Sequence, residues 1–235
     1  ERGEKWKSVL TEIFKEKHDW LLQIITSDLR NQFLKERKPK ANDLILDIGA
    51  GWGQFSIPLA KTNRICSLEP TPERLDMVKC IATQEKVSNN MYFVGTDYLD
   101  TEFESKFDLI LCIGVLEWVG SFRDDAEPME LQLSFLKKAR KELKPKGKMI
   151  IGIENRIGLK YLMGALDDHT GLPHISYLEY ASARKRYREK TKEELRCFTY
   201  GMEEYNKMLT SAGFTKVQFF AALPDYKLPV KIFRI

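Results

Sequence analysis

The stretch from Leu44 to Ser56 places one carboxylate close to three glycines, a combination that can bind a small polar ligand. Asp47 lies two residues before Gly49, and Gly51 and Gly53 follow at intervals of two. Glycine lets the backbone turn with positive φ and lets a ligand lie against the main chain. A helix that begins after such a turn directs free N–H groups at that ligand. The pattern predicts a binding turn, and Asp47 suits a ligand that carries an ammonium group.

The glycine spacing argues against two common phosphate-binding loops. A dinucleotide-binding turn that begins at Gly49 would need its third glycine at position 54, where Gln54 stands. A P-loop needs Gly-Lys-Ser or Gly-Lys-Thr, and neither occurs here. A tight turn between strand and helix that binds nothing is the alternative, and the segments downstream favour binding.

Two more acidic residues follow short apolar segments that are typical of strands. Glu69 comes directly after the segment 63–68 and lies 22 residues beyond Asp47, where nucleotide-binding folds place a carboxylate that accepts bonds from both ribose hydroxyls. Asp97 comes shortly after the segment 91–95. Acidic residues also commonly cap strands, so each signal is weak alone and gains weight from the glycine turn.

Strand-like and helix-like segments alternate along the chain as far as residue 153. The expected strands are 44–48, 63–68, 91–95, 107–119 and 148–153, with helices after Pro72 and over 128–143. This order predicts an α/β fold with a doubly wound, mostly parallel sheet. Ligands in such sheets bind beyond the carboxyl ends of the strands, where Asp47, Glu69, Asp97 and Ile113 are all expected.

The remaining segments suggest additions to this core. Residues 1–40 carry apolar side chains at helical spacing, which predicts two N-terminal helices ahead of a main domain over 41–235. Residues 154–200 break the alternation, and so long a connection predicts a lid-like, substrate-binding insertion after the fifth strand. A helix over 199–213, a strand over 214–222 and an edge strand over 230–235 complete the expected order.

The motif Asp-x-Gly-x-Gly-x-Gly resembles motif I of the class I S-adenosylmethionine-dependent methyltransferases, and the resemblance covers roughly residues 40–153 and 200–222. It implies a Rossmann-like fold and S-adenosylmethionine as cofactor, with S-adenosylhomocysteine as product. It also implies a set of cofactor-binding residues: Asp47, Gly49, Ala50, Gly51 and Gly53 in the turn, Glu69 and Pro70 at the ribose, Asp97 and Tyr98 at the adenine, and Ile113 and Gly114 beneath the sulfur.

A narrower resemblance lies in the segments 153–161, 168–171 and 224–229. These are similar to methyltransferase domains that accompany glycosyltransferases in the synthesis of cell-surface polysaccharides. This resemblance implies a saccharide or lipid-linked saccharide as the acceptor and a glycosyltransferase as a partner.

A general base is expected only for some acceptors. An amine acceptor needs to be neutral, whereas a hydroxyl must also lose its proton. The candidates are Glu154, Asp168, His169 and His174, and a hydrogen bond within a loop is the alternative role for each. We expect His169 to be the base or to orient the acceptor, with Asp168 as a neighbouring carboxylate, because histidine titrates near neutral pH.

Composition narrows the function classes. The 235 residues are 43% apolar and 31% charged, which fits a soluble globular protein. The three histidines and four scattered cysteines form no C-x-x-C or H-E-x-x-H motif, so we expect no metal. The cysteines suggest a reducing compartment, and with no signal peptide or membrane span apparent we expect a cytoplasmic location.

Three functions remain open at this point. The first is methyl transfer to oxygen or nitrogen of a small molecule or saccharide. The second is a non-catalytic module that keeps the fold for binding, which the acidic residues at all three strand ends disfavour. The third is a nucleic-acid methyltransferase that uses the basic run 184–196, with seven Lys or Arg against three Asp or Glu. The mild net charge of +4 and the absence of an Asn/Asp-Pro-Pro-Tyr motif argue against this third function.

Overall fold

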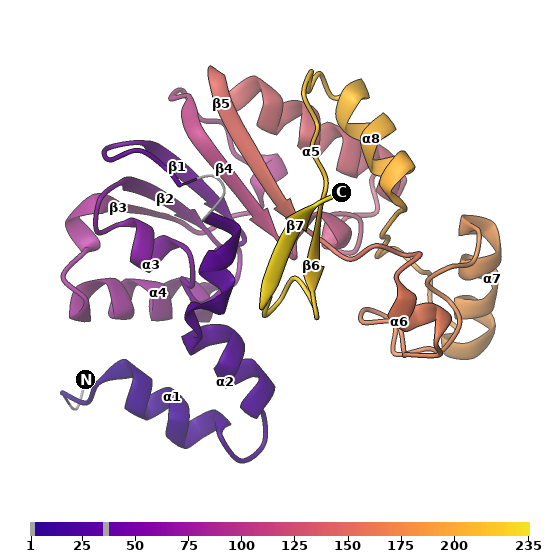
Figure 1. Ribbon diagram of the computed structural model, residues 1–235, viewed down its shortest axis with the longest axis horizontal. Helices are drawn as coiled ribbons and strands as arrows, with labels where there is room; N and C mark the ends of the chain where they lie inside the picture. Colours follow the sequence, from indigo (N-terminus) through magenta and orange to yellow (C-terminus); the bar gives the residue numbers. More distant parts are fainter. Residues whose placement is uncertain (1–2, 35–37) are drawn as a thin grey trace. The chain divides into compact units, whose positions relative to one another are not determined.

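The computed structural model describes residues 3–34 and 38–235. Five parallel strands form one sheet in the order β3-β2-β1-β4-β5 (Figure 1). The strands are β1 (Leu44–Ile48), β2 (Arg64–Leu68), β3 (Met91–Val94), β4 (Phe107–Ile113) and β5 (Leu143–Gly152). Because the chain builds outward from β1 on one side and then on the other, the strand order reverses between β1 and β4. The expected doubly wound, parallel, Rossmann-like sheet is confirmed.

Eight α-helices accompany the strands among the described residues. They are α1 (Trp6–Phe14), α2 (Asp19–Thr26), α3 (Ser56–Leu59), α4 (Pro72–Gln84), α5 (Pro128–Glu142), α6 (Leu159–Leu162), α7 (Tyr180–Thr191) and α8 (Met202–Ser211). Pro72 begins α4, a position where the missing N–H leaves no helical bond unmade. No helix in the described ranges combines the length and the apolar character needed to cross a lipid bilayer.

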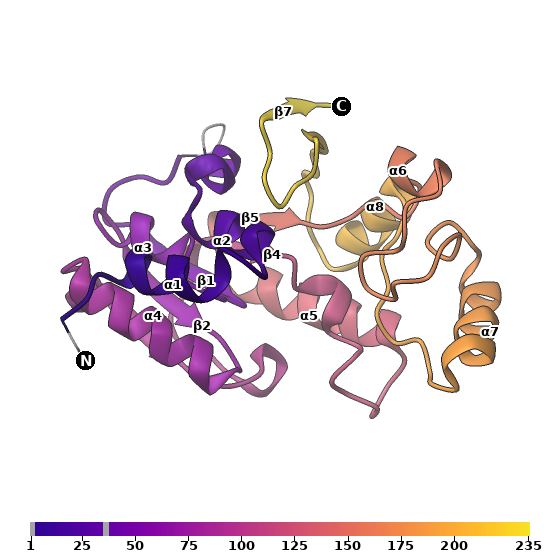
Figure 2. The ribbon, with the colours of Figure 1, turned by 90° about the horizontal axis from the view of Figure 1, so that it is seen from below.

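The central strands are buried on both faces, as a parallel sheet requires. Ile45 lies between Ile65 on β2 and Leu109 on β4, and all three side chains are almost inaccessible. The short helix α3 packs on β2, and α4 packs on β3 and on α3 (Figure 2). This packing holds the ends of β1 and β2, and the turns that follow them, in a fixed place.

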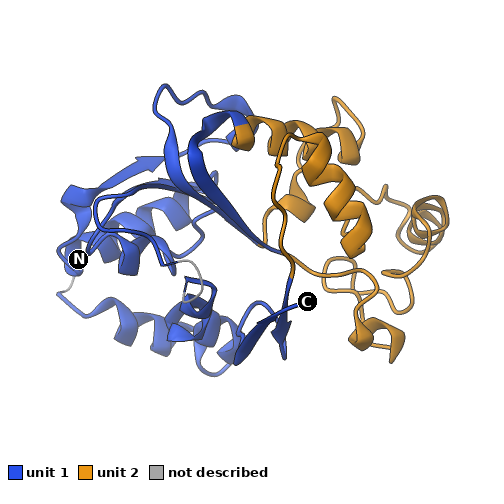
Figure 3. Cartoon of the chain, turned by 45° about the horizontal axis from the view of Figure 1, so that its top comes forward, with its two compact units in different colours: residues 1–113, 141–152, 220–235 blue, residues 114–140, 153–219 orange. Residues whose placement is uncertain are grey.

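The chain divides into two compact units (Figure 3). Unit 1 contains residues 1–113, 141–152 and 220–235, and therefore the whole sheet. Unit 2 contains residues 114–140 and 153–219. The assignment of 1–40, 41–235 and 154–200 as separate parts stays a prediction.

The two N-terminal helices are present, and they pack on the glycine turn within unit 1. Leu10, Leu22 and Ile25 form a small apolar cluster that also contacts Trp52. The indole N–H of Trp6 donates a hydrogen bond of 2.9 Å to Glu85 just beyond α4. The helices are followed by a 3-10 helix over Asp28–Leu34.

Three expected strands have clearly different limits in the structure. The fifth was expected over 148–153, but β5 already begins at Leu143 and ends at Gly152. The fourth was expected to reach Val119, but β4 ends at Ile113 because Gly114 turns with φ of 72° and a 3-10 helix follows over Leu116–Trp118. The expected strand over 214–222 is wrong in extent, because only β6 (Phe220–Leu223) forms.

The last strands also differ in their partners. β6 pairs with β7 (Lys231–Arg234) in a separate antiparallel sheet of two strands. Pro224 and Pro229 lie in the connection, and proline cannot donate to a strand ladder, so both strands stay short.

Leu111 tests how much the sheet contributes to stability, because its side chain is fully buried in β4. We expect Leu111→Ala to lower the free energy of unfolding by about 2–5 kcal/mol, since the substitution leaves a cavity. Ile13→Ala removes a side chain that is 58% exposed and serves as the control. Urea unfolding followed by circular dichroism measures both, and equal losses would contradict this account of the core.

Candidate functional site

The glycine turn is bound to the end of the neighbouring strand in unit 1. The N–H groups of Gly49 and Ala50 donate to the carbonyl of Leu68, at 2.8 and 3.0 Å. Gly53 has φ of 80°, and a Cβ there would lie 2.9 Å from the side chain of Ile57. Both the backbone conformation and the close approach of α3 therefore require glycine at this position.

Glu69 connects the two sequence signals that predicted a ligand site. Its side chain accepts a hydrogen bond of 2.8 Å from the N–H of Gly51 and one of 3.1 Å from the N–H of Thr71. The residue is only 3% exposed, while Pro70 beside it is exposed. The fold thus brings the glycine turn after β1 and the acidic end of β2 into direct contact.

Asp47 lies inside the fold, beneath the turn. One oxygen of its carboxylate accepts a 2.6 Å bond from the hydroxyl of Ser56, which in turn accepts one from Ser67. Burial raises the pKa of Asp47 to about 6, although the Ser56 bond and the charge of Arg30 act in the opposite direction. Its predicted contact with a cofactor ammonium group stays a prediction.

Arg30 is a candidate that the sequence did not reveal. It comes from the 3-10 helix before β1, is 7% exposed, and lies 5.5 Å from the ring centre of Phe55. Its Nε is buried and has no hydrogen-bond partner among the described residues. Burial lowers the pKa of Arg30, whereas nearby Tyr226 and Asp47 raise it. A single arginine that follows two amphipathic helices carries no sequence pattern that marks it as a functional residue.

The predicted adenine-side residues differ in how they are placed. Asp97 accepts a 2.7 Å bond from the N–H of Leu99 and so caps the short helix that follows β3. Tyr98 is 3% exposed, and its hydroxyl donates a 2.5 Å bond to Glu142. Because that ring is held in the interior, we expect any contact of Tyr98 with a ligand to come from its main chain.

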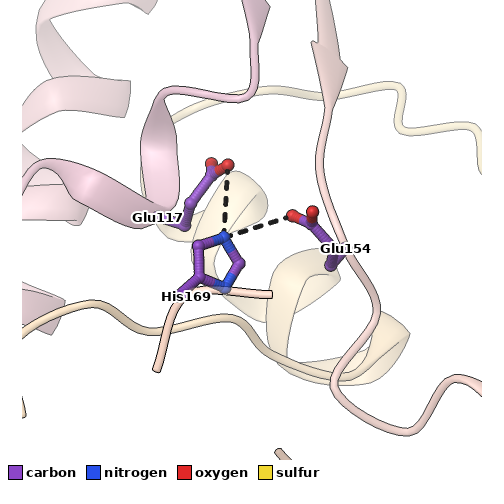
Figure 4. Close-up of side chains that lie close together, drawn as sticks. All are labelled: Glu117, Glu154 and His169. Atoms are coloured by element: carbon purple, nitrogen blue, oxygen red, sulfur yellow. Dashed lines mark ion pairs between the residues drawn. The ribbon is translucent and has the colours of Figure 1, made fainter. Parts of the chain in front are cut away.

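A second cluster of titratable groups lies in unit 2 (Figure 4). Nε2 of His169 is 3.7 Å from Oε1 of Glu117 and 3.5 Å from Oε2 of Glu154. The three side chains are 6%, 1% and 2% exposed. The fold therefore brings together two of the predicted catalytic residues and adds Glu117, which the sequence analysis did not single out.

Asp167 lies on the other side of the His169 ring. This buried carboxylate accepts hydrogen bonds from the main-chain N–H of His169, from the main-chain N–H and hydroxyl of Thr170, and from the hydroxyl of Ser176. Its Oδ1 is 3.9 Å from Nδ1 of His169, and the Trp118 ring meets the imidazole edge-on at 5.1 Å. The neighbouring carboxylate that faces the imidazole is thus Asp167.

The other two candidates for a base lie apart from this cluster. Asp168 is exposed and accepts bonds from Lys160 and from the hydroxyl of Tyr161. His174 is exposed as well, and its Nδ1 is 2.9 Å from the hydroxyl of Tyr177.

The charges within the cluster influence each other strongly. Burial and the nearby Glu154 raise the pKa of Glu117, which His169 partly offsets. Burial lowers the pKa of His169, but Glu117 and Glu154 outweigh that effect and raise it overall. Both nitrogens of His169 face carboxylates, so the arrangement favours the protonated, positively charged form of the imidazole. Its role as a general base stays a prediction.

Gln132 on α5 fixes the segment that carries Glu117. Its fully buried amide donates hydrogen bonds of 2.9 and 3.0 Å to the carbonyls of Leu116 and Phe198. The amide oxygen accepts a hydrogen bond of 2.7 Å from the hydroxyl of Tyr200. Glu117 also accepts a main-chain bond of 3.2 Å from Phe198. The one sequence signal for Glu117 is a carboxylate in the most apolar stretch of the chain.

A cavity of about 300 Å³ lies within unit 2 and reaches His169. Its other lining residues combine aromatic and polar side chains, among them Arg156, Thr170, Tyr180, Phe198 and Tyr200. Arg156 is fixed by a 2.6 Å bond to the carbonyl of Leu178 and by an ion pair of 3.2 Å with Glu204. The cavity offers both stacking surfaces and hydrogen-bonding groups to a ligand.

Comparisons with known proteins identify the family of the chain. A family model described as a methyltransferase domain matches residues 39–213, well over half of the chain. The chain belongs to this family of methyltransferases. It is therefore an S-adenosylmethionine-dependent methyltransferase, as its motif I predicts.

Two curated relatives differ in how much of the chain they match. The ubiquinone biosynthesis O-methyltransferase of Rickettsia bellii is 24% identical over 247 residues, covering 95% of this chain and 98% of that protein. The tRNA 5-carboxymethoxyuridine methyltransferase of Escherichia coli is 36% identical over 84 residues, covering 34% of this chain and 31% of that protein.

Solved structures with this fold span several activities. A candidate O-methyltransferase from Nostoc punctiforme matches with a TM-score of 0.58 and 17% identity, over 87% of this chain and 55% of that one. The 4+2 cyclase SpnF matches with a TM-score of 0.59 and 15% identity, over 85% of this chain and 61% of that one. This chain spans little more than half the length of these two proteins. At such identities the likeness shows the fold alone, and a fold does not determine a reaction.

The buried carboxyl of Asp47 predicts a dependence of stability on pH. Its pKa is about 6 in the fold against 3.8 for an ordinary aspartate, so the folded state loses stability as pH rises from about 4 to 6 and stays lowered above that. The amide of Asp47→Asn does not titrate, so the variant lacks this loss of stability. The unfolding free energy of the variant minus that of the wild type should therefore increase by up to about 3 kcal/mol as pH rises across that window. Urea unfolding from pH 4 to 8 measures it, with exposed Asp76→Asn as control, and a flat difference would contradict the assignment.

Proposed function

We propose that this methyltransferase binds S-adenosylmethionine at the carboxyl ends of β1, β2 and β3 and methylates an oxygen of a small molecule that unit 2 recognises. The cofactor supplies a methyl group made electrophilic by a sulfonium. The observation that carries the proposal is the contact between Glu69 and the N–H of Gly51. It places a carboxylate and a glycine turn side by side at the edge where parallel sheets bind ligands.

The residues at this edge fit the parts of the cofactor. The turn of Gly49, Ala50, Gly51 and Gly53 would lie along its amino-acid part, where Asp47 would favour the ammonium group. Glu69 would exchange its bond to Gly51 for the ribose hydroxyls, with Pro70 beside it. Asp97 and Tyr98 would lie at the adenine, and Ile113 and Gly114 beneath the sulfur.

Arg30 adds a group that this set lacks. The cofactor carries a carboxylate next to its ammonium group, and a buried guanidinium with an unused donor is the natural partner for a carboxylate. Because Arg30 is also close enough to influence Asp47, the two residues would bind the two charges of the amino-acid part together.

Unit 2 supplies the argument for the acceptor. Its cavity joins aromatic Tyr180, Phe198 and Tyr200 to the charged Arg156, which suits a ring that carries hydroxyl groups. The name of the Rickettsia relative, an O-methyltransferase, supports oxygen as the methylated atom. A saccharide acceptor and a glycosyltransferase partner are supported by motif resemblance alone.

A nucleic-acid acceptor is the second candidate. It is supported by α7, on which Arg184, Lys185, Arg186, Arg188 and Lys190 follow one another closely, and by the tRNA-modifying relative. Binding to RNA that weakens steeply as salt rises would favour this candidate over a small molecule.

Glu69 gives a direct test of the cofactor site. Glu69→Ala should weaken binding of S-adenosylhomocysteine roughly 10- to 100-fold, because hydrogen bonds to a charged group contribute about 1.5–3 kcal/mol. Glu73→Ala changes an exposed glutamate in the first turn of α4 and should leave the affinity within about twofold. Titration calorimetry measures both. Equal effects of the two substitutions would mean that the ribose lies elsewhere.

The acceptor class is tested by methyl transfer from a labelled donor. The protein is incubated in turn with phenolic metabolites, with free and lipid-linked saccharides, and with tRNA, and labelled products are identified by mass spectrometry. We expect the label on an oxygen of a small molecule and its loss with Glu69→Ala. Label found in tRNA alone would overturn the proposed acceptor and leave the proposed cofactor site standing.

A further inference from the structure

Glu117, Glu154 and His169 have the composition and spacing of a metal site. One oxygen from each glutamate and one nitrogen of the imidazole lie within 4.8 Å of one another. The three residues belong to unit 2 but come from separate segments. Glu117 lies in the 3-10 helix after β4, Glu154 is the second residue after β5, and His169 lies in the loop after α6. A solvated surface cluster does not explain them, because all three side chains are at least nine-tenths buried.

The distances match metal ligands better than hydrogen bonds. Nε2 of His169 is 3.7 Å from Glu117 and 3.5 Å from Glu154, whereas hydrogen bonds from nitrogen to oxygen measure about 2.7–3.2 Å. Ligand atoms that share one tetrahedral zinc ion at about 2.0–2.2 Å are about 3.3–3.6 Å apart. The imidazole and each carboxylate are therefore separated as two ligands of one ion would be.

Glu117 provides an independent sign that a ligand is expected here. Its side chain is 1% exposed and its carboxylate is directed at His169 (Figure 4). Its Oε2 is buried and has no hydrogen-bond partner among residues 3–34 and 38–235. An unmatched carboxylate oxygen removed from water is costly, and a cation would compensate for that cost.

The surroundings have the two further features of a reactive metal site. Oδ1 of Asp167 lies 3.9 Å from Nδ1 of His169, on the side of the ring where a carboxylate commonly lies beside a metal-binding histidine, and Asp167 holds the loop through four hydrogen bonds from main-chain and hydroxyl groups. The cavity in unit 2 reaches His169 and could admit a further ligand to an ion. Three protein ligands with one accessible position are typical of catalytic rather than structural sites.

We propose that Glu117, Glu154 and His169 bind a divalent transition-metal ion such as Zn²⁺. The mixed set of one nitrogen and two carboxylate oxygens suits Zn²⁺ or Mn²⁺ better than Mg²⁺, which prefers oxygen and water. This departs from the expectation of no metal, which rested on sequence spacing. Three ligands spread over more than fifty residues form no local motif. The site concerns unit 2 alone, so it does not depend on the proposed cofactor site or acceptor.

Metal binding can be measured without any methyl transfer. The protein of residues 1–235 is freed of metal with a chelator and titrated with Zn²⁺ by calorimetry, and with Co²⁺ by visible absorption, which reports the coordination number. We expect one ion per chain, a rise in melting temperature, and a Co²⁺ spectrum of four or five ligands. Glu117→Gln and His169→Asn should each weaken Zn²⁺ binding by more than about 100-fold, beyond the effect of losing a residue outside the ligand set.

Two control variants make the test decisive. His174→Asn removes an exposed histidine from the same loop, and Glu203→Gln removes an exposed glutamate from α8, so neither should change the affinity. Glu117→Gln keeps the shape of the side chain, and circular dichroism of the metal-free variant checks that it folds. Zn²⁺ and Co²⁺ binding weaker than millimolar, or binding that His174→Asn abolishes and Glu117→Gln does not, would overturn the proposal.

Discussion

Taking a carboxylate out of water is costly unless hydrogen bonds or an opposite charge replace the lost hydration, and both units are shaped by this constraint. Unit 1 buries Asp47 and Glu69 at the ends of neighbouring strands. Unit 2 buries Glu117 and Glu154. Glu69 and Glu154 come just after β2 and β5, where the chain leaves the sheet, whereas Asp47 is the penultimate residue of β1 and Glu117 lies in the 3-10 helix after β4.

The two units meet the constraint in different ways. In unit 1, Glu69 accepts from two backbone N–H groups, and Asp47 accepts from Ser56. In unit 2, a single imidazole lies opposite two glutamates at distances too long for hydrogen bonds. The first arrangement is compensated by hydrogen bonds within unit 1, whereas in the second Oε2 of Glu117 is buried without a hydrogen-bond partner among the described residues. Incomplete compensation of buried charge is expected where a ligand supplies the missing partner.

Much of unit 1 could be predicted because the sequence patterns that define its strands and turns each lie within a short stretch of the chain. The limits of β1 follow from five apolar or buried positions that end at glycine, and Glu69 follows from its place after the next strand. Local pattern also explains the failures. The apolar run beyond Ile113 continues to Val119, and periodicity cannot distinguish a strand from a turn of 3-10 helix that buries the same side chains.

The candidate site in unit 2 could be predicted only in part, because its geometry depends on contacts between distant segments. The sequence identified Glu154 and His169 by residue type, but which aspartate faces the imidazole depends on the loop. Asp167 turns inward to bind Thr170 and Ser176, while Asp168 turns outward to Lys160. Arg30 was missed for the same reason, since its burial beside Phe55 depends on how the N-terminal segment packs.

The way the chain enters unit 2 explains how its cluster is held in place. The unit is formed from two separate segments, 114–140 and 153–219, and Glu117 belongs to the first while Glu154 and His169 belong to the second. Gln132 joins them, because its one amide bonds to Leu116 in the first segment and to Phe198 and Tyr200 in the second. A buried amide has few geometries in which all its bonds are made at once, so Gln132 fixes the segment that carries Glu117 against the segment that carries Phe198 and Tyr200. A substitution in α5 could therefore alter the position of Glu117 without any change in the glycine turn.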